Sequence, residues 1–307
     1  MNSEPAAITP ERLLQRLDWH VVRRLDGLLQ GDYRSLFYGH GVDFADLREY
    51  QPGDDIRHID WNVTARVNLP HVRQYLEDRE IIAWFLLDLS PSMAFGAVDR
   101  QKRQVLVEFV ATLARLLTRG GNRVGALLYG RSPLRTIPPR SGRIQVLRLI
   151  NDLLQTPAAA PAAPGAVTDL APLFTAALNT IKQRALVFVV SDFISVPGWQ
   201  RPLHLLGRRH ETLAIRLTDP REHALPDAGL LVMQDAETGE QLLVDTHDPL
   251  FRRQFAALVQ QQEADLAAAF RRAGVDALAL STEEDLVRAI VRFATLRQRR
   301  SRAPHRA

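Results

Sequence analysis

After residue 78, continuous apolar runs alternate with amphipathic stretches along the chain. The runs Ile81–Leu89 and Ala185–Ser191 consist almost entirely of apolar residues, which is typical of strands buried on both faces of a sheet. Between them, Arg100–Arg119 repeats apolar residues at helical spacing. Parallel strands need long crossover connections, so repeated strand–helix units predict a mostly parallel sheet with helices on both faces. We therefore expect a doubly wound α/β domain over residues 79–297.

The same patterns predict the other elements of this domain. Proline and alanine mark residues 155–167 as a surface loop, and the turn AETGE joins two short strands into a β-hairpin inserted at about residues 228–246. The final helix is expected to begin at the capping-box-like residues 281–284. The remaining predicted strands are Arg123–Tyr129, Arg135–Ile137, Thr212–Leu217 and Asp276–Leu280, and the predicted helices are 142–154, Leu170–Arg184, Gly198–Arg209, Pro249–Ala273 and Thr282–Arg297.

Residues 1–78 are expected to form an N-terminal region of different character. Thr9 and Pro10 provide a helix start, and an apolar stripe at helical spacing continues to Leu29. Charged and aromatic residues then dominate to about residue 68 with little periodicity, and His71–Leu76 predicts a strand.

The net charge of +4 is located at one end of the chain. Five arginines lie in residues 297–307, and without them the acidic residues slightly outnumber the basic ones. We expect residues 298–307 to form a solvated basic tail. Because a nucleic-acid-binding fold would carry a basic stripe within its body, the sequence argues against a nucleic-acid partner.

The absence of cysteine excludes a disulfide framework, a thiolate zinc site and a cysteine nucleophile. No apolar run approaches the roughly 20 residues that a membrane-spanning helix needs. The first residues of the chain also lack the basic-then-apolar order of a signal peptide. We therefore expect a cytoplasmic protein without a membrane span.

Side chains with hard oxygen atoms follow the buried strands at the points where the strands end. Asp88, Ser90 and Ser92 close the first apolar run, Asp192 follows the second, and the proline-rich loop leads to Thr168. Ligands of doubly wound sheets bind beyond the carboxyl ends of the strands, so these side chains are expected to share one edge. Magnesium prefers octahedral oxygen ligands and keeps several waters. The sequence thus predicts a site for Mg²⁺ or Mn²⁺ that an incoming carboxylate can complete.

Two sets of motifs resemble known families. The spacing Asp88-x-Ser90-x-Ser92 with Thr168 and Asp192 resembles the metal ion-dependent adhesion site of von Willebrand factor A domains. The segment YGHGVDFADLREYQPGDDIRHIDWNVTAR at residues 38–66 resembles the signature of the bacterial domain of unknown function 58 (DUF58) family. The motifs DLSPSM, TDL, VVSDF and STEEDLVRAIVRF fit the same family, so the resemblance covers nearly the whole chain.

The resemblance implies a von Willebrand factor A-like domain whose metal lies at the five matching positions. It also implies a partner, a MoxR-type AAA+ ATPase, with a role in chaperone-like assembly or metal-centre maturation. A client protein donating Asp or Glu to the metal would be a further partner. We therefore expect a non-enzymatic, magnesium-dependent protein-binding module.

Two alternatives compete for the five predicted metal-site residues. The serines and Asp192 could serve only as N-caps of following helices. Asp88 could instead be the nucleophile of a metal-dependent phosphohydrolase, although such enzymes need a second carboxylate two residues on, where this chain has Ser90. Gly-x-Ser-x-Gly, P-loop and His-Glu-x-x-His motifs are absent from the sequence.

The segment 38–66 is unusually rich in arginine, aromatic and acidic residues. Arginine and aromatic side chains are favoured in interface hot spots, which makes Arg48, Arg57, Trp61 and Arg66 candidate partner-binding residues. The alternative is a self-satisfied salt-bridge network pinned by Trp61, which the density of opposite charges favours.

Overall fold

The computed structural model describes residues 9–25, 46–51, 54, 56, 59–67, 69–74, 80–97, 100–130, 133–157, 167–292 and 295. The chain divides into two compact units. The larger, α/β unit consists of residues 1–31 and 81–293, and the smaller unit consists of residues 32–80 and 294–307.

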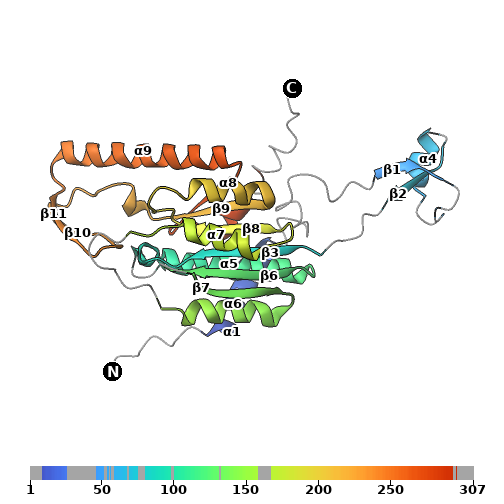
Figure 1. The fold of residues 1–307 in the computed structure, drawn as a ribbon, viewed down its shortest axis with the longest axis horizontal. Helices are drawn as coiled ribbons and strands as arrows, with labels where there is room; N and C mark the ends of the chain where they lie inside the picture. Colours follow the sequence, from blue (N-terminus) through green and yellow to red (C-terminus); the bar gives the residue numbers. More distant parts are fainter. Residues whose placement is uncertain are drawn as a thin grey trace. The chain divides into compact units, whose positions relative to one another are not determined.

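A six-stranded sheet with the order β12-β9-β8-β3-β6-β7 forms the centre of the α/β unit (Figure 1). All neighbouring strands pair in parallel except the edge strand β7, which runs antiparallel to β6. The strand order reverses between β3 and β8, which makes the gap between their carboxyl ends the switch point of a doubly wound sheet. The α/β fold class predicted from the sequence is therefore confirmed. The strands are β3 (Ile82–Asp88), β6 (Arg123–Tyr129), β7 (Pro133–Arg140), β8 (Leu186–Ser191), β9 (Glu211–Thr218) and β12 (Asp276–Ser281).

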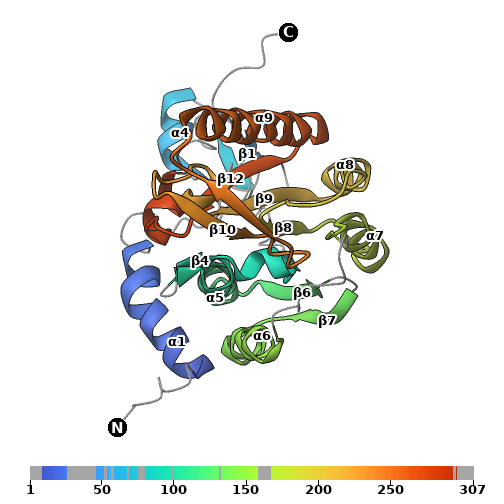
Figure 2. The same cartoon turned by 90° about the vertical axis from the view of Figure 1, so that its left-hand side faces the viewer.

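Helices cover both faces of this sheet. In Figure 2, α1 and α5 lie on one face, and α7 and α8 lie on the other. The N-terminal helix α1 packs against α5 and α6, so it belongs to the α/β unit and is separate from the charged segment that follows it in sequence. The helices are α1 (Pro10–Leu17), α5 (Lys102–Arg119), α6 (Arg143–Gln155), α7 (Ala171–Thr180), α8 (Gln200–Arg209) and α9 (Pro249–Ala273). In the part of the chain that the structure describes, none of the helices is long and apolar enough to cross a membrane.

The central strands β3 and β8 carry the core. Phe85 and Phe188 stack on these two strands with ring centroids 5.2 Å apart, and Phe109 of α5 meets Phe188 edge-on. All three side chains are at most 1% exposed. Burying a side chain of this size contributes about 1.5–3 kcal/mol, so the strand ends project from a strongly stabilised scaffold.

Most predicted bounds in the α/β unit agree with the structure to within two residues, and the larger differences lie in three elements. The helix expected at Leu170–Arg184 ends at Thr180, because Ile181 turns into extended backbone and buries its side chain. The strand expected at Arg135–Ile137 is the middle of the longer β7. The last helix starts at residue 286, after Asp285, whose carboxylate accepts from the backbone N–H of Arg288 at 3.0 Å, and its expected end at Arg297 lies outside the described residues. The expected start at residues 281–284 is therefore wrong.

The inserted hairpin is present as predicted, between β9 and α9. Its strands β10 (Leu230–Gln234) and β11 (Gln241–Asp245) pair antiparallel as a separate two-stranded sheet. At its base, Thr246 donates from both its backbone N–H and its hydroxyl to the carbonyl of Gly229, at 2.8 and 2.7 Å. Gly229 has φ +81°, a conformation that favours glycine, so the chain can turn sharply into β10 there.

The smaller unit has more regular structure than its sequence pattern indicated. Strand β1 (Asp46–Glu49) pairs antiparallel with β2 (His71–Gln74), and α4 (Trp61–Val67) lies between them in sequence. A carboxylate oxygen of Asp60 accepts from the N–H of Val63 at 3.3 Å and caps α4. Only the strand at β2 was expected, since elements this short contain too few residues to show a period.

Candidate metal-binding site

The five predicted site residues come together at the switch point of the sheet. Asp88 ends β3, Ser90 and Ser92 follow it, Asp192 follows β8, and Thr168 precedes α7. Each of these side chains is at most 3% exposed.

Hydrogen bonds join the residues that follow β3. The backbone N–H of Ser90 donates to Oδ1 of Asp88 at 2.9 Å, and the hydroxyl oxygens of Ser90 and Ser92 lie 3.1 Å apart. Ser90 makes no side-chain capping bond to the 3₁₀ turn Pro91–Ala94, and the helix after Asp192 begins only at Gln200. The N-cap alternative is therefore wrong for Ser90 and Asp192.

Ser191 orients the second oxygen of Asp88. Its hydroxyl donates to Oδ2 of Asp88 at 2.6 Å and accepts from the backbone N–H of Phe193 at 2.8 Å. Phe193 has φ +59°, the one positive value at a non-glycine position among the described residues. Its ring packs edge-on against Phe270 at 4.8 Å, and this contact holds the turn after β8 in its strained conformation.

The loop that carries Thr168 is tied to the segment after β8. The carbonyl of Thr168 accepts from the N–H of Val196 at 3.0 Å, and the N–H of Leu170 donates to the hydroxyl of Ser195, also at 3.0 Å. The Tyr129 hydroxyl donates to the carbonyl of Asp169 at 2.5 Å. The loop around Thr168 is therefore held in place by the segment after β8 and by the end of β6.

A buried lysine neutralises part of the acidic charge. Nζ of Lys102 lies 2.6 Å from both Asp192 Oδ2 and Glu222 Oε1, and the lysine side chain has no exposed surface. Burial alone would lower the pKa of Lys102, but the charges of the two carboxylates outweigh it and raise the pKa above its usual value. Lys102 is thus a fixed cation beside the site.

The surroundings of Asp88 disfavour the charged form of its carboxylate. Its complete burial, together with the charge of Asp192, raises the pKa of Asp88 to about 7, although hydrogen bonds from Ser191 and Ser90 act in the opposite direction. A neighbouring positive charge would therefore stabilise the charged form of this carboxylate.

The structure adds a carboxylate that the sequence did not single out. One oxygen of Glu237, at the tip of the hairpin, accepts from the backbone N–H of Ser92 at 3.1 Å. Its other oxygen accepts from the hydroxyl of Thr168 at 2.7 Å. Glu237 thereby bridges the segment after β3 and the loop before α7. The six groups that surround this edge of the sheet are called the ring of oxygen groups below: Asp88, Ser90, Ser92, Thr168, Asp192 and Glu237. Lys102 and Glu222 were also missed, because nothing in their spacing links them to the strand ends. Ser191 was not singled out either, although it is the last residue of β8 and directly precedes Asp192.

This donor set fits a small, hard divalent cation. The hydroxyl pair of Ser90 and Ser92 at 3.1 Å and the Thr168–Glu237 oxygen pair at 2.7 Å are spaced like adjacent corners of an octahedron whose metal–oxygen bonds are about 2.0–2.1 Å. Among the described residues no group of three His, Cys, Asp or Glu side chains forms a metal cluster. Half of the oxygen donors here are hydroxyl groups and half are carboxylates, and a donor set made only of oxygen suits magnesium and manganese better than zinc.

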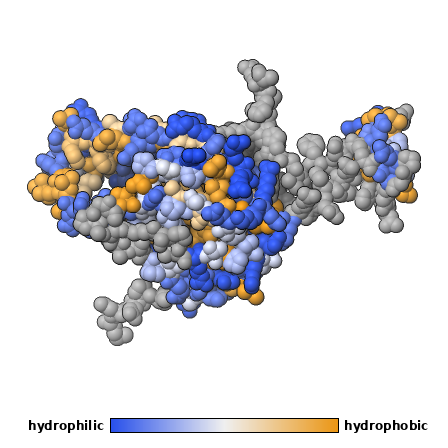
Figure 3. All heavy atoms as spheres, viewed as in Figure 1, coloured by the Kyte–Doolittle hydropathy of each residue, from blue (hydrophilic) through white to orange (hydrophobic). Residues whose placement is uncertain are grey.

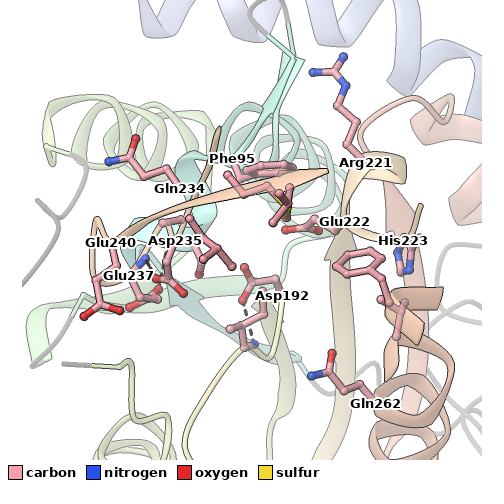
Figure 4. A pocket seen from close by; sticks show the side chains of 18 of the residues that line it. Phe95, Asp192, Arg221, Glu222, His223, Gln234, Asp235, Glu237, Glu240 and Gln262 are labelled. Atoms are coloured by element: carbon pink, nitrogen blue, oxygen red, sulfur yellow. Dashed lines mark hydrogen bonds between the residues drawn. The ribbon is translucent and has the colours of Figure 1, made fainter. Parts of the chain in front are cut away.

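A cavity of about 770 Å³ opens beside these residues. Figure 4 shows Asp192, Glu222 and Glu237 around it, with Asp235 and Glu240 on the hairpin tip nearby. Apolar residues of β10, β11 and α9 line one part of the cavity, and charged residues such as Arg216, Arg221 and Glu263 line another. A ligand of some size can therefore reach the edge of the site.

The four candidate partner-binding residues belong to the smaller unit. Trp61 is 69% exposed at the start of α4, so its ring is not the buried pin of a salt-bridge network. Arg66, on the same helix, is also exposed. The side chain of Arg48 and the whole of Arg57 lie outside the described residues.

Comparison with known proteins gives a family and several relatives. The family model described as "Protein of unknown function DUF58" matches residues 46–265. "Uncharacterized protein Rv1480" of Mycobacterium tuberculosis and "Uncharacterized protein Mb1516" of Mycobacterium bovis are each 40% identical over 293 residues, which is 95% of this chain and 91% of each relative.

Solved structures with a similar arrangement share little sequence with this chain. The structure of the conserved hypothetical protein BatB from Bacteroides thetaiotaomicron aligns over 71% of this chain and 99% of its own, with 14% identity and a TM-score of 0.45. The von Willebrand factor A domain of SpRpn10 aligns over 69% of this chain and 94% of its own, with 12% identity and a TM-score of 0.38.

Proposed function

The chain belongs to the DUF58 family, and from this starting point we propose that it is a non-enzymatic, magnesium-dependent protein-binding module. One observation carries the proposal. The carboxylates and hydroxyls of the ring of oxygen groups are buried together at the switch point, and hydrogen bonds link all of them except Asp192 into one chain around the ends of β3 and β8. Because half of its donors are neutral hydroxyls, such a ring would leave a bound cation able to attract a further anionic ligand.

Each residue of the ring would have a definite part in holding Mg²⁺ or Mn²⁺. Ser90, Ser92 and Thr168 would offer neutral hydroxyl oxygens, which leave the charge of the ion largely uncompensated. Asp88 and Asp192 would supply the negative charge, directly or through water. The ion's part would be to bind an Asp or Glu side chain of a partner protein.

The phosphohydrolase alternative finds no favourable observation. Both oxygens of Asp88 already accept hydrogen bonds, from Ser90 and Ser191, and the side chain has no exposed surface. The position two residues on, where a catalytic acid is needed, is Ser90, which cannot protonate a leaving group. We therefore keep the binding module as the proposed function.

The proposed partner class is a MoxR-type AAA+ ATPase, for which this protein would serve as an adaptor in chaperone-like assembly or maturation. The basis for this partner is the family resemblance in the motifs of the chain. The exposed Trp61 and Arg66 of α4 are a second place where such a partner can dock.

Thermal unfolding with and without metal tests the metal site. A cation at 100 times its dissociation constant should stabilise the native protein by about 2.7 kcal/mol, which raises the melting temperature by several degrees. We expect this rise with millimolar Mg²⁺ or Mn²⁺ in the wild type and in Asp245→Asn, an exposed control, but not in Asp88→Ala or in Ser90→Ala/Ser92→Ala. An equal rise in all four proteins would place the metal elsewhere.

A further inference from the structure

The hairpin tip buries one acidic side chain and exposes its acidic neighbours. Asp235, Glu237 and Glu240 all lie in the turn between β10 and β11, yet only Glu237 is buried, with 4% of its surface exposed. Burying a carboxylate is costly unless it gains specific partners. The burial of the Glu237 side chain therefore has to be explained by the groups that it contacts inside the site.

Two partners of Glu237 belong to the proposed metal site itself. Its oxygens accept from the backbone N–H of Ser92 at 3.1 Å and from the hydroxyl of Thr168 at 2.7 Å. These are two of the three segments that build the ring. Glu237 thus reaches the ring from outside the sheet, from the direction in which a partner's carboxylate would have to arrive.

The turn is built to point Glu237 inward. Oδ1 of Asp235 accepts from the backbone N–H groups of Glu237 and Thr238, both at 2.8 Å. Gly239 has φ +75° and donates its N–H to the carbonyl of Asp235 at 2.8 Å. Because these bonds lie within the turn, its shape does not depend on its docking at the site.

The rest of the hairpin is lightly anchored. On one face, Leu230, Val232 and Leu243 are more than 60% exposed, and Figure 3 shows apolar side chains gathered at this end of the α/β unit. The clasp between Thr246 and Gly229 holds the base. The Glu237 carboxylate therefore supplies a main attachment of the tip, and a segment held in this way can leave without unfolding the sheet.

We propose that Glu237 is an internal ligand of the metal site, occupying the coordination position that a partner's carboxylate takes when it binds. The hairpin is then a built-in competitor, and the partner must displace its tip. This inference rests on the proposed function, because it needs a metal at Asp88, Ser90, Ser92 and Thr168.

The inference predicts that loss of the Glu237 charge weakens the binding of the metal and allows an external carboxylate to bind. Removing the Glu237 charge takes one ligand from the ion, so Mn²⁺ affinity should fall about tenfold in Glu237→Gln. The freed position should then accept a small carboxylate. Acetate at tens of millimolar should restore affinity in Glu237→Gln but leave the wild type unchanged, because a tethered ligand has an effective concentration in the millimolar range or above.

Mn²⁺ titration, followed by the electron paramagnetic resonance signal of the free ion, measures these affinities. Glu240→Gln, an exposed change of the same kind in the same turn, is the matched control. Glu237→Asp, which keeps the charge but withdraws it by one methylene, is the second variant if Glu237→Gln folds poorly, and it should also bind Mn²⁺ more weakly than the wild type.

A spin label gives a readout of the hairpin itself. The chain has no cysteine, so Gln241→Cys, at an exposed position of β11, accepts a single nitroxide. With Mg²⁺ present, the label should be more mobile in the Glu237→Gln background than in the Glu240→Gln background.

The outcomes separate this inference from the proposed function. Weaker Mn²⁺ binding, acetate rescue and a mobile label in Glu237→Gln support it. Equal Mn²⁺ affinity in the wild type, Glu237→Gln and Glu240→Gln overturns the internal ligand and leaves the metal-binding module intact. Wild-type Mn²⁺ binding no stronger than that of Asp88→Ala overturns both.

Discussion

The two central strands of the sheet and the inserted hairpin differ in how much of their side-chain surface they bury. Strands β3 and β8 bury nearly every side chain, and their phenyl rings stack inside the core. Strands β10 and β11 form a sheet of their own and leave most of their aliphatic side chains at least partly exposed. Yet both regions contribute oxygen atoms to the same site.

The difference separates the fixed part of the site from its exchangeable part. Asp88 and the hydroxyl groups project from the scaffold, where displacement would cost core packing. Glu237 comes from the hairpin, whose departure costs few buried contacts. A binding module needs both: a rigid set of ligands to hold an ion, and one position that can be vacated. The following predictions test this division.

The largest expected effect is on the scaffold. Phe188→Ala removes a fully buried ring from the centre of β8 and should lower the free energy of unfolding by about 3–5 kcal/mol. Leu243→Ala, at a position of β11 that is 63% exposed, should change it by less than about 0.5 kcal/mol. Urea unfolding measures both. Similar losses in the two variants would contradict the contrast between the regions.

The next effect concerns the charge balance beside the scaffold. Lys102→Met leaves the buried Asp192 and the partly exposed Glu222 without their cation, and this should cost about 3–5 kcal/mol in metal-free protein. Lys182→Met, an exposed change, is the matched control. Calorimetry in EDTA measures the difference, and a Lys102→Met protein as stable as the control would show that the ion pairs contribute nothing.

The pH dependence of the stability of the metal-free protein should reveal the raised pKa of Asp88. The pKa of Asp88 is about 7 in the native state and near 3.8 when unfolded, so the native state keeps a proton that the unfolded state loses between these values. Stability should therefore fall as the pH rises from 5.5 to 8, by about 2 kcal/mol. Melting curves in EDTA measure the slope, and Asp88→Asn should flatten it. A wild-type slope that equals the Asp88→Asn slope would remove Asp88 as its source.

The smallest effect is expected at the base of the hairpin. Gly229→Ala forces a side chain into a conformation with φ +81° and should cost about 1 kcal/mol, mostly in local attachment. Amide hydrogen exchange should become faster in β10 and β11 but remain unchanged in β3 and β8. Faster exchange in the central strands as well would mean that the hairpin and the scaffold open together.

Most strands and helices of the α/β unit were predictable because residues close together in the sequence define them. The apolar run Arg123–Tyr129 and the helix Pro249–Ala273 have the predicted bounds, since apolar periodicity and flanking glycine or proline residues define their ends. The grouping of Asp88 and Asp192 followed from one rule of topology, that parallel strands end at the same edge.

The remaining site residues depend on information that the sequence pattern does not contain. Glu237 lies 145 residues from Ser92 and 69 from Thr168, and its role depends on where an inserted hairpin folds back. The start of the last helix was wrong for a different reason. Residues 281–285 offer several polar groups that can cap a helix, and only the three-dimensional path of the chain selects Asp285.

The ion pairs of Lys102 also bear on the order in which the chain would fold and bind a metal. A lysine is part of the chain from synthesis onward, whereas a metal has to be acquired. Because Lys102 already compensates Asp192 from within, the sheet edge can close around its acidic groups before any ion arrives. Under the proposed function, folding and metal binding would therefore be separate steps, and the chain would fold before it binds its cation.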